Sequence, residues 1–126
     1  MSELSSFELG WLVGILEGEG SFTLECNNPR IKVEITDEDT SYRVAALFER
    51  ITGKPCHVYD KAPSGNSVQH LFITRIGSRG AKDVMRLVVK YMSHRRRQRI
   101  WQCLNGFKSK KLKIDLVQLG LIKEQG

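Results

Sequence analysis

Residues 9–22 read Leu-Gly-Trp-Leu-Val-Gly-Ile-Leu-Glu-Gly-Glu-Gly-Ser-Phe, an apolar segment that ends with two closely spaced carboxylates. Gly10, Gly14 and Gly18 recur four positions apart, so they share one face if the segment is a helix. A glycine inside a helix costs roughly 1 kcal/mol relative to alanine, so three of them need a structural reason. Their spacing favours a helix that packs closely against a second helix. The carboxylates then lie at its end, where hard cations such as Mg²⁺ bind oxygen ligands.

The nine residues 12–20 are Leu-Val-Gly-Ile-Leu-Glu-Gly-Glu-Gly, and Ser21-Phe22 follow them. This stretch resembles the signature of the LAGLIDADG homing endonucleases, with its spacing intact. Five letters are replaced by close relatives (Val for Ala, Ile for Leu, Leu for Ile, and Glu for Asp twice), and one Ala by Gly. The resemblance covers residues 6–107. It implies an α+β fold of the order α-β-β-α-β-β-α-α, in which a twisted antiparallel sheet binds DNA and the motif helix lies at a dimer interface.

Two pairs of segments alternate apolar and polar residues, as half-buried strands do. The first pair is 21–26 and 31–36, with Asn27-Asn28-Pro29 between them, and the second is 56–61 and 68–76. The pattern predicts two hairpins. We expect these side chains to face the core: Phe22, Leu24, Val33 and Ile35 in the first hairpin, and Val58, Leu71 and Ile73 in the second.

Three more segments carry apolar residues at helical spacing. Residues 39–52 are predicted to form a helix that ends at Gly53, and Ser78 is predicted to cap the following helix. The spacing over residues 100–107 indicates a last helix. The expected buried residues are Val44, Leu47, Phe48 and Ile51, then Val84, Leu87, Val88 and Tyr91, and finally Ile100, Cys103, Leu104 and Phe107.

A chain of 126 residues is long enough for one domain with its own core, in which residues 108–126 form a basic C-terminal tail or a closing helix. No apolar run is long enough to span a membrane, and no signal-peptide pattern precedes the motif. We therefore expect neither a membrane protein nor a secreted one. Cys26, Cys56 and Cys103 are odd in number and lack metal-type spacing. They predict free, buried thiols in a reducing compartment, either a bacterial or phage-infected cytoplasm or an organelle.

Charge is distributed unevenly along the chain, which has a net charge of +6 and a pI near 9.4. Residues 1–63 carry 6 basic and 11 acidic side chains, a net −5, whereas residues 64–126 carry 14 and 3, a net +11. Such asymmetry favours a polyanionic partner. The densest basic run, residues 94–99, is either a phosphate-binding surface or a solvated basic face or localisation tract.

The resemblance implies metal-assisted hydrolysis of DNA phosphodiester bonds. Glu19 occupies the position of the family's catalytic acid and is expected to bind the metal ion, together with the backbone carbonyl of Gly18. Mg²⁺ is the expected cofactor, with Mn²⁺ as a substitute and Ca²⁺ supporting DNA binding without cleavage. Glu17 matches the earlier acid of the motif, which leaves it either a structural capping role or an accessory metal role.

Two further positions carry over from the family. Asp37 lies where the family keeps a polar residue that orients the attacking water, although it also suits the cap of the following helix. Arg95 lies where the family has a basic residue near the scissile phosphate, with Arg97 as the substitute candidate. Arginine keeps its proton, so it would stabilise charge and would not act as a base.

One copy of the motif is present, and single-motif members of the family act as homodimers. The apolar positions 9, 12, 13 and 16 recur at helical spacing and suit the chain's own core, which leaves the glycines for a partner. The alternative is that the glycines pack against another element of the same chain. The expected twofold interface comprises Gly10, Trp11, Gly14, Glu17 and Gly18.

The outward side chains of the two hairpins are expected to lie in the major groove, where base edges carry a distinct donor and acceptor pattern. These DNA-facing residues are Thr23, Glu25, Arg30, Lys32 and Glu34, then His57, Tyr59, Lys61, His70, Phe72 and Arg75. Phe72 is unusual on a solvated face: it either meets thymine methyl groups or indicates a register shifted by one residue. Further DNA contacts, to phosphates, are expected from Arg96, Lys108 and Lys110.

The sequence thus predicts a homodimeric, divalent-metal-dependent endonuclease of an intron or other mobile element. It would cut double-stranded DNA at a long pseudo-palindromic site and leave staggered 3′ overhangs, with no small-molecule substrate. The first alternative is a cleavage-inactive DNA- or RNA-binding module of the same fold, such as an intron maturase or a transcriptional regulator. The second is a basic dimerising domain that binds protein or ribosomal RNA.

Overall fold

The computed structural model describes residues 3–63, 65 and 69–105 and is an α+β structure. Its elements, in the order that the residue patterns predicted, are α1 (Ser6–Glu19), β1 (Gly20–Glu25), β2 (Asn28–Ile35), α2 (Glu38–Thr52), β3 (Val58–Lys61), β4 (Leu71–Gly77), α3 (Ser78–Val88), the 3₁₀ turn η1 (Val89–Tyr91) and α4 (His94–Asn105). None of the helices in this part combines the length and apolar character that a transmembrane span requires. The predictions for Phe107, Lys108, Lys110 and the rest of residues 106–126 lie outside the described residues.

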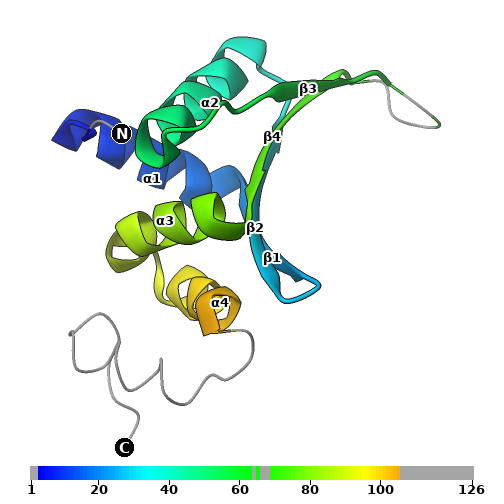
Figure 1. The fold of residues 1–126 in the computed structure, drawn as a ribbon. Helices are drawn as coiled ribbons and strands as arrows, with labels where there is room; N and C mark the ends of the chain where they lie inside the picture. The colour runs from blue at the N-terminus through cyan, green and yellow to red at the C-terminus, as the bar shows by residue number, and fades with distance from the viewer. Residues whose placement is uncertain (1–2, 64, 66–68, 106–126) are drawn as a thin grey trace, which may run out of the picture.

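The four strands form one antiparallel sheet in the order β1-β2-β4-β3. Figure 1 shows a curved sheet with all four α-helices on one side, and no described element covers the other side. We call this second side the outer face. Because directly paired residues of antiparallel strands point to the same side of a sheet, the register determines which side chains reach the outer face.

The core lies between the sheet and the helices. Its fully buried side chains come from each of the four α-helices and from β2: Leu12, Leu16, Ile31, Val33, Val44, Phe48, Val84, Met85, Val88 and Ile100. Leu9 and Val13 pack against the same cluster. The motif helix α1 therefore buries its leucine side, as predicted, and turns its glycines away from the core.

Both ends of α2 are capped by residues of suitable chemistry. Asp37 precedes the helix, and its carboxylate accepts the Thr40 backbone N–H at 2.8 Å. Gly53 ends the helix with φ 73° and donates its N–H to the Glu49 carbonyl at 2.8 Å, a left-handed conformation that favours glycine. The predicted end at Gly53 is confirmed, and Asp37 takes the capping role that its position allowed.

The prediction for the helix after β4 was wrong in two respects. Ser78 does not cap α3: it is the first helical residue, with φ 53°, and no side chain makes a capping hydrogen bond there. Leu87 and Tyr91, expected in the core, are 36% and 51% exposed. After α3 ends, the tighter 3₁₀ turn changes the angular spacing of side chains and leaves Tyr91 in solvent. The buried residues of α3 are instead Ala81, Val84, Met85 and Val88.

The first hairpin turns earlier than expected. Its turn is Cys26-Asn27, with φ values of 51° and 64°, so β2 already begins at Asn28. Two central residues with positive φ match the twist of the flanking strands. The predicted inward set is confirmed: Phe22 and Val33 are buried, and the other two, Leu24 and Ile35, pack against the core.

In the second hairpin, the predicted register of β4 was wrong by one residue. Thr74 pairs with Val33 on one side and with Val58 on the other, and it is completely buried. Its hydroxyl donates a hydrogen bond to the Ser41 carbonyl at 3.2 Å. A threonine whose hydroxyl has a hydrogen-bond partner is tolerated in a core. The prediction treated Thr74 as a surface residue because it is polar, and it therefore assigned the two sides of β4 wrongly.

The corrected register exchanges the two sides of β4. Leu71 and Ile73 lie on the outer face and not in the core, while Phe72 points to the helix side. The His70 ring stacks on Phe72 with centroids 5.2 Å apart, so neither ring belongs to the outer face. The run Leu71-Phe72-Ile73 is apolar throughout, which is why alternation did not distinguish its two sides.

All three cysteines are free, as predicted. Cys103 is buried and Cys56 is partly buried, but Cys26 lies exposed in the first turn, contrary to expectation. Burial, with a smaller contribution from Glu49, raises the pKa of the Cys56 thiol to about 11. This thiol therefore stays protonated and unreactive near neutral pH.

Candidate active site and nucleic-acid interface

The glycines of α1 form an uncovered surface, which we call the glycine face. Gly10, Gly14 and Gly18 are exposed, and a Cβ atom built on any of them would meet no described atom within 4 Å. Gly20 differs, because a Cβ there would lie 2.7 Å from the Leu16 carbonyl oxygen. Within the described residues, the glycines therefore do not pack against another element of the chain.

Aromatic side chains accompany the glycine face. Phe7 precedes Gly10 and Gly14 by three and seven residues, so it shares their side of the helix. It is 72% exposed. The guanidinium of Arg43 lies 4.1 Å from the centroid of the Trp11 ring and 5.8 Å from that of Phe7. The exposed ring and the open stripe together form an apolar surface on this side of α1.

Glu17 links the end of α1 to the start of α4. Its carboxylate accepts the Ser93 backbone N–H at 2.6 Å and the Ser93 hydroxyl at 2.9 Å, and it lies 3.8 Å from Arg96 Nε. The Ser93 carbonyl in turn accepts the Arg97 N–H of the first helical turn. A negative charge at a helix N-terminus is favourable, so Glu17 stabilises the start of α4, and an accessory metal role stays a prediction. Sequence reasoning missed Ser93, although serine directly before a helical segment is a capping signal.

Glu19 is the last residue of α1 and is exposed. No hydrogen bond or ion pair joins its carboxylate to another residue in the described part of the chain. These residues also contain no group of three or more His, Cys, Asp and Glu side chains that could hold a metal ion. Mg²⁺ prefers six oxygen ligands. The Glu19 carboxylate and the Gly18 carbonyl lie at the helix end, where carbonyls lack helical partners, and metal binding there stays a prediction.

Two arginines of the basic run bind the protein itself. Arg96 donates to the Gly20 carbonyl, and Arg99 Nε donates to the Phe22 carbonyl at 2.8 Å. The Arg96 side chain is only 18% exposed, and its guanidinium lies 5.7 Å from the centroid of the Phe22 ring. Arg96 therefore fastens α4 to β1, an edge strand with carbonyls that lack strand partners. A phosphate contact from Arg96 stays a prediction.

A cleft of about 360 Å³ opens beside these arginines, directly after Glu19 in the chain. Arg95 is exposed at this cleft, and no described residue pairs with it. Arg97 does not line the cleft, and its buried Nε has no hydrogen-bond partner among the described residues. The structure therefore places Arg95, the first of the two candidates, at a cleft whose lining begins at Gly20, the residue after Glu19. The cleft is lined by Gly20, Ser21, Phe22, Thr23, Arg95, Arg96 and Arg99.

Asp37 is engaged at the start of α2. Its carboxylate accepts both the hydroxyl and the backbone N–H of Thr40, and these two bonds hold the pKa of Asp37 below its ordinary value. No described contact joins Asp37 to Glu19 or Arg95. A role in orienting water stays a prediction.

The outer face carries most of the side chains that the sequence assigned to DNA. The register places these residues on it: Thr23, Glu25, Arg30, Lys32, Glu34, Tyr59, Lys61 and Arg75, together with the unexpected Leu71 and Ile73. His57 is exposed but precedes β3. On the helix side, His70 makes a close polar contact with Asp60.

The acids of the outer face are paired with neighbouring cations. Glu25 lies 2.9 Å from Arg30, and Glu34 lies 3.6 Å from Lys32 and 3.5 Å from Lys61. Among the described residues, the face carries four cations against two acids. The net charge of this part of the face is therefore positive, even though Glu25 and Glu34 lie on it.

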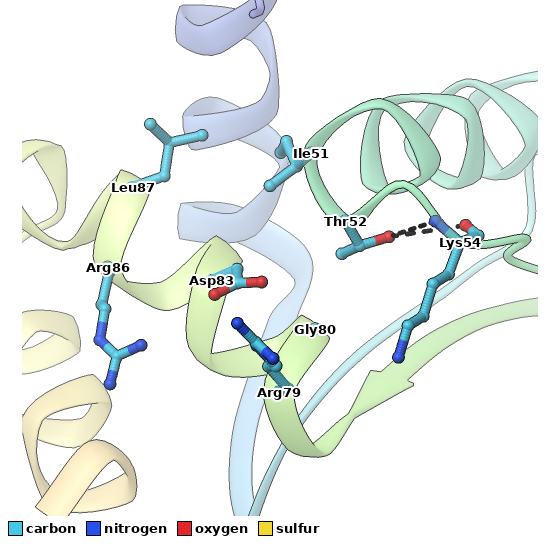
Figure 2. Close-up of a pocket in the computed structure, with 8 residues that line it drawn as sticks. All are labelled: Ile51, Thr52, Lys54, Arg79, Gly80, Asp83, Arg86 and Leu87. Atoms are coloured by element: carbon cyan, nitrogen blue, oxygen red, sulfur yellow. Dashed lines mark hydrogen bonds between the residues drawn. The ribbon is translucent and has the colours of Figure 1, made fainter. Parts of the chain in front are cut away.

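A second cleft, of about 630 Å³, lies between the end of α2 and α3 (Figure 2). Gly80 allows the two helices to come close, because a Cβ there would lie 3.2 Å from the Thr52 methyl carbon. No sequence pattern pointed to this cleft, and it shares no residue with the cleft beside β1 or with the outer face. It is lined by Ile51, Thr52, Lys54, Arg79, Gly80, Asp83, Arg86 and Leu87.

The chain matches no protein-family model and no curated protein. Three features of the described residues bear on its function: the uncovered glycine face, the unpaired carboxylate of Glu19 next to the residues of a basic cleft, and the positive outer face of the sheet.

Proposed function

We propose that this chain is a homing endonuclease of the LAGLIDADG type, a homodimer that uses divalent metal ions to cut both strands of a long pseudo-palindromic DNA site. Cleavage would leave staggered 3′ overhangs. The observation that carries the proposal is a glycine face with no described neighbour, which ends at the unpaired carboxylate of Glu19. The three free thiols suit a reducing intracellular compartment.

A second copy of the chain is the partner that suits the glycine face. The open space over the glycines admits another helix backbone, and in a twofold pair each α1 meets its own copy. Parallel packing of the two helices would bring both Glu19 carboxylates and both Gly18 carbonyls to one end. Two carboxylates at short range repel each other unless a cation neutralises them. Dimerisation would therefore complete the metal site that one copy lacks.

The residues near this end have distinct roles in the proposed reaction. Glu19 and Gly18 would hold Mg²⁺, or Mn²⁺ in its place. When bound, the ion would neutralise charge on the scissile phosphate and favour ionisation of a water molecule. Arg95 would donate charge-assisted hydrogen bonds to a phosphate oxygen at the cleft beside β1. The bonds from Arg96 and Arg99 to β1 hold α4 in place and so position Arg95.

The outer face suits double-stranded DNA. A two-stranded ribbon fits the major groove, and the four cations of the outer face complement the phosphates on either side. A symmetric dimer would present two such faces, which is why the target is expected to be pseudo-palindromic.

Cleavage selection tests the proposal directly. A library of randomised, pseudo-palindromic duplexes is incubated with Mg²⁺ and either the wild-type protein or the Glu19→Gln variant. We expect the wild type to cut duplexes that share one long sequence, and the variant to bind the same duplexes in Ca²⁺ without cutting them. A purified dimer that cuts no duplex with Mg²⁺ or Mn²⁺ would refute the proposal.

A cleavage-inactive binding module of the same fold is the second candidate. The observation that favours it is Asp37, whose carboxylate caps α2 and makes no described contact with the acidic end of α1. In that case, the wild type and the Glu19→Gln variant would enrich the same duplex or RNA, and neither would nick it.

A further inference from the structure

Leu71 and Ile73 are out of place for a solvated surface. Both lie on the outer face and are partly exposed. Neither belongs to the core cluster, whereas Ile35 and Ile76, which point to the helix side, pack against it. Apolar side chains that miss the core gain free energy only when another surface removes them from water.

Tyr59 extends the same surface. It is paired with Ile73 across the strands and is 45% exposed. The Arg75 guanidinium stacks over its ring at 4.5 Å. Glu34, the neighbour of Ile73 on β2, is held by two lysines. We call Tyr59, Leu71 and Ile73 the apolar strip. Cations border it, and the nearest acid is neutralised.

We infer that the apolar strip contacts the C5-methyl groups of thymines in the major groove of bound DNA, an inference that rests on the proposed function. Thymine alone among the four bases presents a methyl group there, and apolar side chains recognise it by contact. Leu71 and Ile73 offer no donor or acceptor, so they carry no preference for the polar base edges. The bordering cations suit the adjacent phosphates. An RNA duplex does not suit the strip, because uracil lacks the methyl group and the A-form major groove is deep and narrow.

The test removes the methyl group from the DNA and leaves the protein intact. One duplex enriched from the randomised library in Ca²⁺ is synthesised again with single thymines of each half-site replaced by deoxyuridine, which preserves every hydrogen-bonding group. At thymines under the strip, we expect the Kd to rise about fourfold for each methyl group lost, the effect of exposing one buried methyl. Thymines elsewhere in the site should show no significant change.

Protein variants assign the effect to the strip. A double variant, Leu71→Ala with Ile73→Ala, should bind the thymine and deoxyuridine duplexes equally well. Both side chains lie outside the core cluster, so the variant should fold. Leu87→Ala, which shortens an exposed leucine of α3 on the helix side of the sheet, is the matched control and should keep the full preference for the methyl group.

Three outcomes would overturn the inference. A wild-type protein that binds its enriched duplex but is indifferent to every methyl group refutes it and leaves the proposed function intact. A methyl preference that persists in the double variant also refutes it, because another element then reads the methyl group. If no duplex is enriched at all, the proposed function fails, and the inference fails with it.

Discussion

The glycine face of α1 and the outer face of the sheet are both uncovered by described residues, but the first is built on glycines, which have no side chains, and the described part of the second carries four cations. The glycine face has no side chains between its backbone and solvent, so it suits one rigid, closely fitting partner. The outer face has long side chains around an apolar strip, so it suits a charged partner with a varied surface. Both faces are exposed, so exposure does not distinguish their partners. The length and charge of the side chains on each face indicate which kind of partner suits it.

The two faces meet at one peptide bond. Glu19 ends the helix that carries the glycine face, and Gly20 begins the first strand of the sheet. A change at this junction is expected to affect catalysis without loss of DNA binding, whereas changes within either face should act through association, either with the partner copy or with DNA.

The largest effect is expected at the junction. Glu19→Gln removes the carboxylate charge and should lower the cleavage rate by more than about 100-fold, since even indirect metal partners contribute 10–100-fold. DNA affinity in Ca²⁺ should be unchanged. Single-turnover cleavage and equilibrium binding measure the two quantities. Glu3→Gln, an exposed carboxylate before α1, is the matched control. If Glu19→Gln cuts at the wild-type rate, Glu19 is not the metal ligand.

The next largest effect is expected on the glycine face. Gly14→Leu should convert the dimer to a monomer, because its side chain fills the space that the partner helix needs. The monomer itself should not be weakened, since the position is open and leucine favours the helix by roughly 0.7 kcal/mol over glycine. Light scattering gives the mass, and urea unfolding gives the stability.

Gly20→Ala is the matched control for this change. Its Cβ would lie 2.7 Å from the Leu16 carbonyl oxygen, so it should destabilise the fold of each copy. An intact dimer of Gly14→Leu would contradict the interface, and a stable Gly20→Ala variant would contradict the packing at the end of α1.

A smaller, position-dependent effect is expected on the outer face. Lys32→Ala should relax the preference at one symmetric pair of base positions, where a direct contact contributes about 1–3 kcal/mol of discrimination. Competition binding with every single-base variant of the enriched site measures this preference. A uniform loss of affinity at all positions would instead identify Lys32 as a phosphate contact.

The smallest effect separates the two roles considered for Asp37. Its pKa in the folded protein lies below the ordinary 3.8, because the Thr40 hydroxyl and N–H bind the carboxylate. The stabilisation of the fold by the ionised Asp37 carboxylate is therefore present above pH 3.8 and is lost as the pH falls through the pKa of Asp37 in the folded protein. Urea unfolding should show that wild type loses more stability than Asp37→Asn over this range, and equal losses would contradict the contribution. Cleavage by Asp37→Asn at neutral pH should persist if capping is its only role.

The two hairpins show when the alternation of apolar and polar residues predicts the inward side of a strand correctly. In β1 and β2 each apolar residue is flanked by polar ones, so the inward set was identified correctly. In β4 the run Leu71-Phe72-Ile73 offers no alternation, and the buried Thr74 appears in a sequence as a surface residue. The hydroxyl partner of Thr74 belongs to α2, so no pattern within the strand could have corrected the register.

In the candidate site too, some residues were predicted from local sequence and the roles of others depend on distant contacts. Glu19 was predicted as the metal ligand from the motif alone, and this role stays a prediction; its carboxylate is exposed and makes no contact with another described residue. The roles of Glu17 and Arg96 depend on contacts with residues 76 positions away in the chain. Sequence spacing does not reveal such contacts, so the sequence could place Arg95 before Arg97 by position but could not show that Arg96 binds β1.

The sequence by itself determined the two unlike sides of α1, the end of α2 at Gly53 and the α+β order, because each depends on side-chain spacing within one segment. Only the tertiary structure decided that Leu71 and Ile73 face outward, that Arg96 binds β1 and that Arg95 stays available at the cleft. These outcomes depend on which distant segments meet, since every buried polar group needs a partner and every strand must share its register with its neighbours.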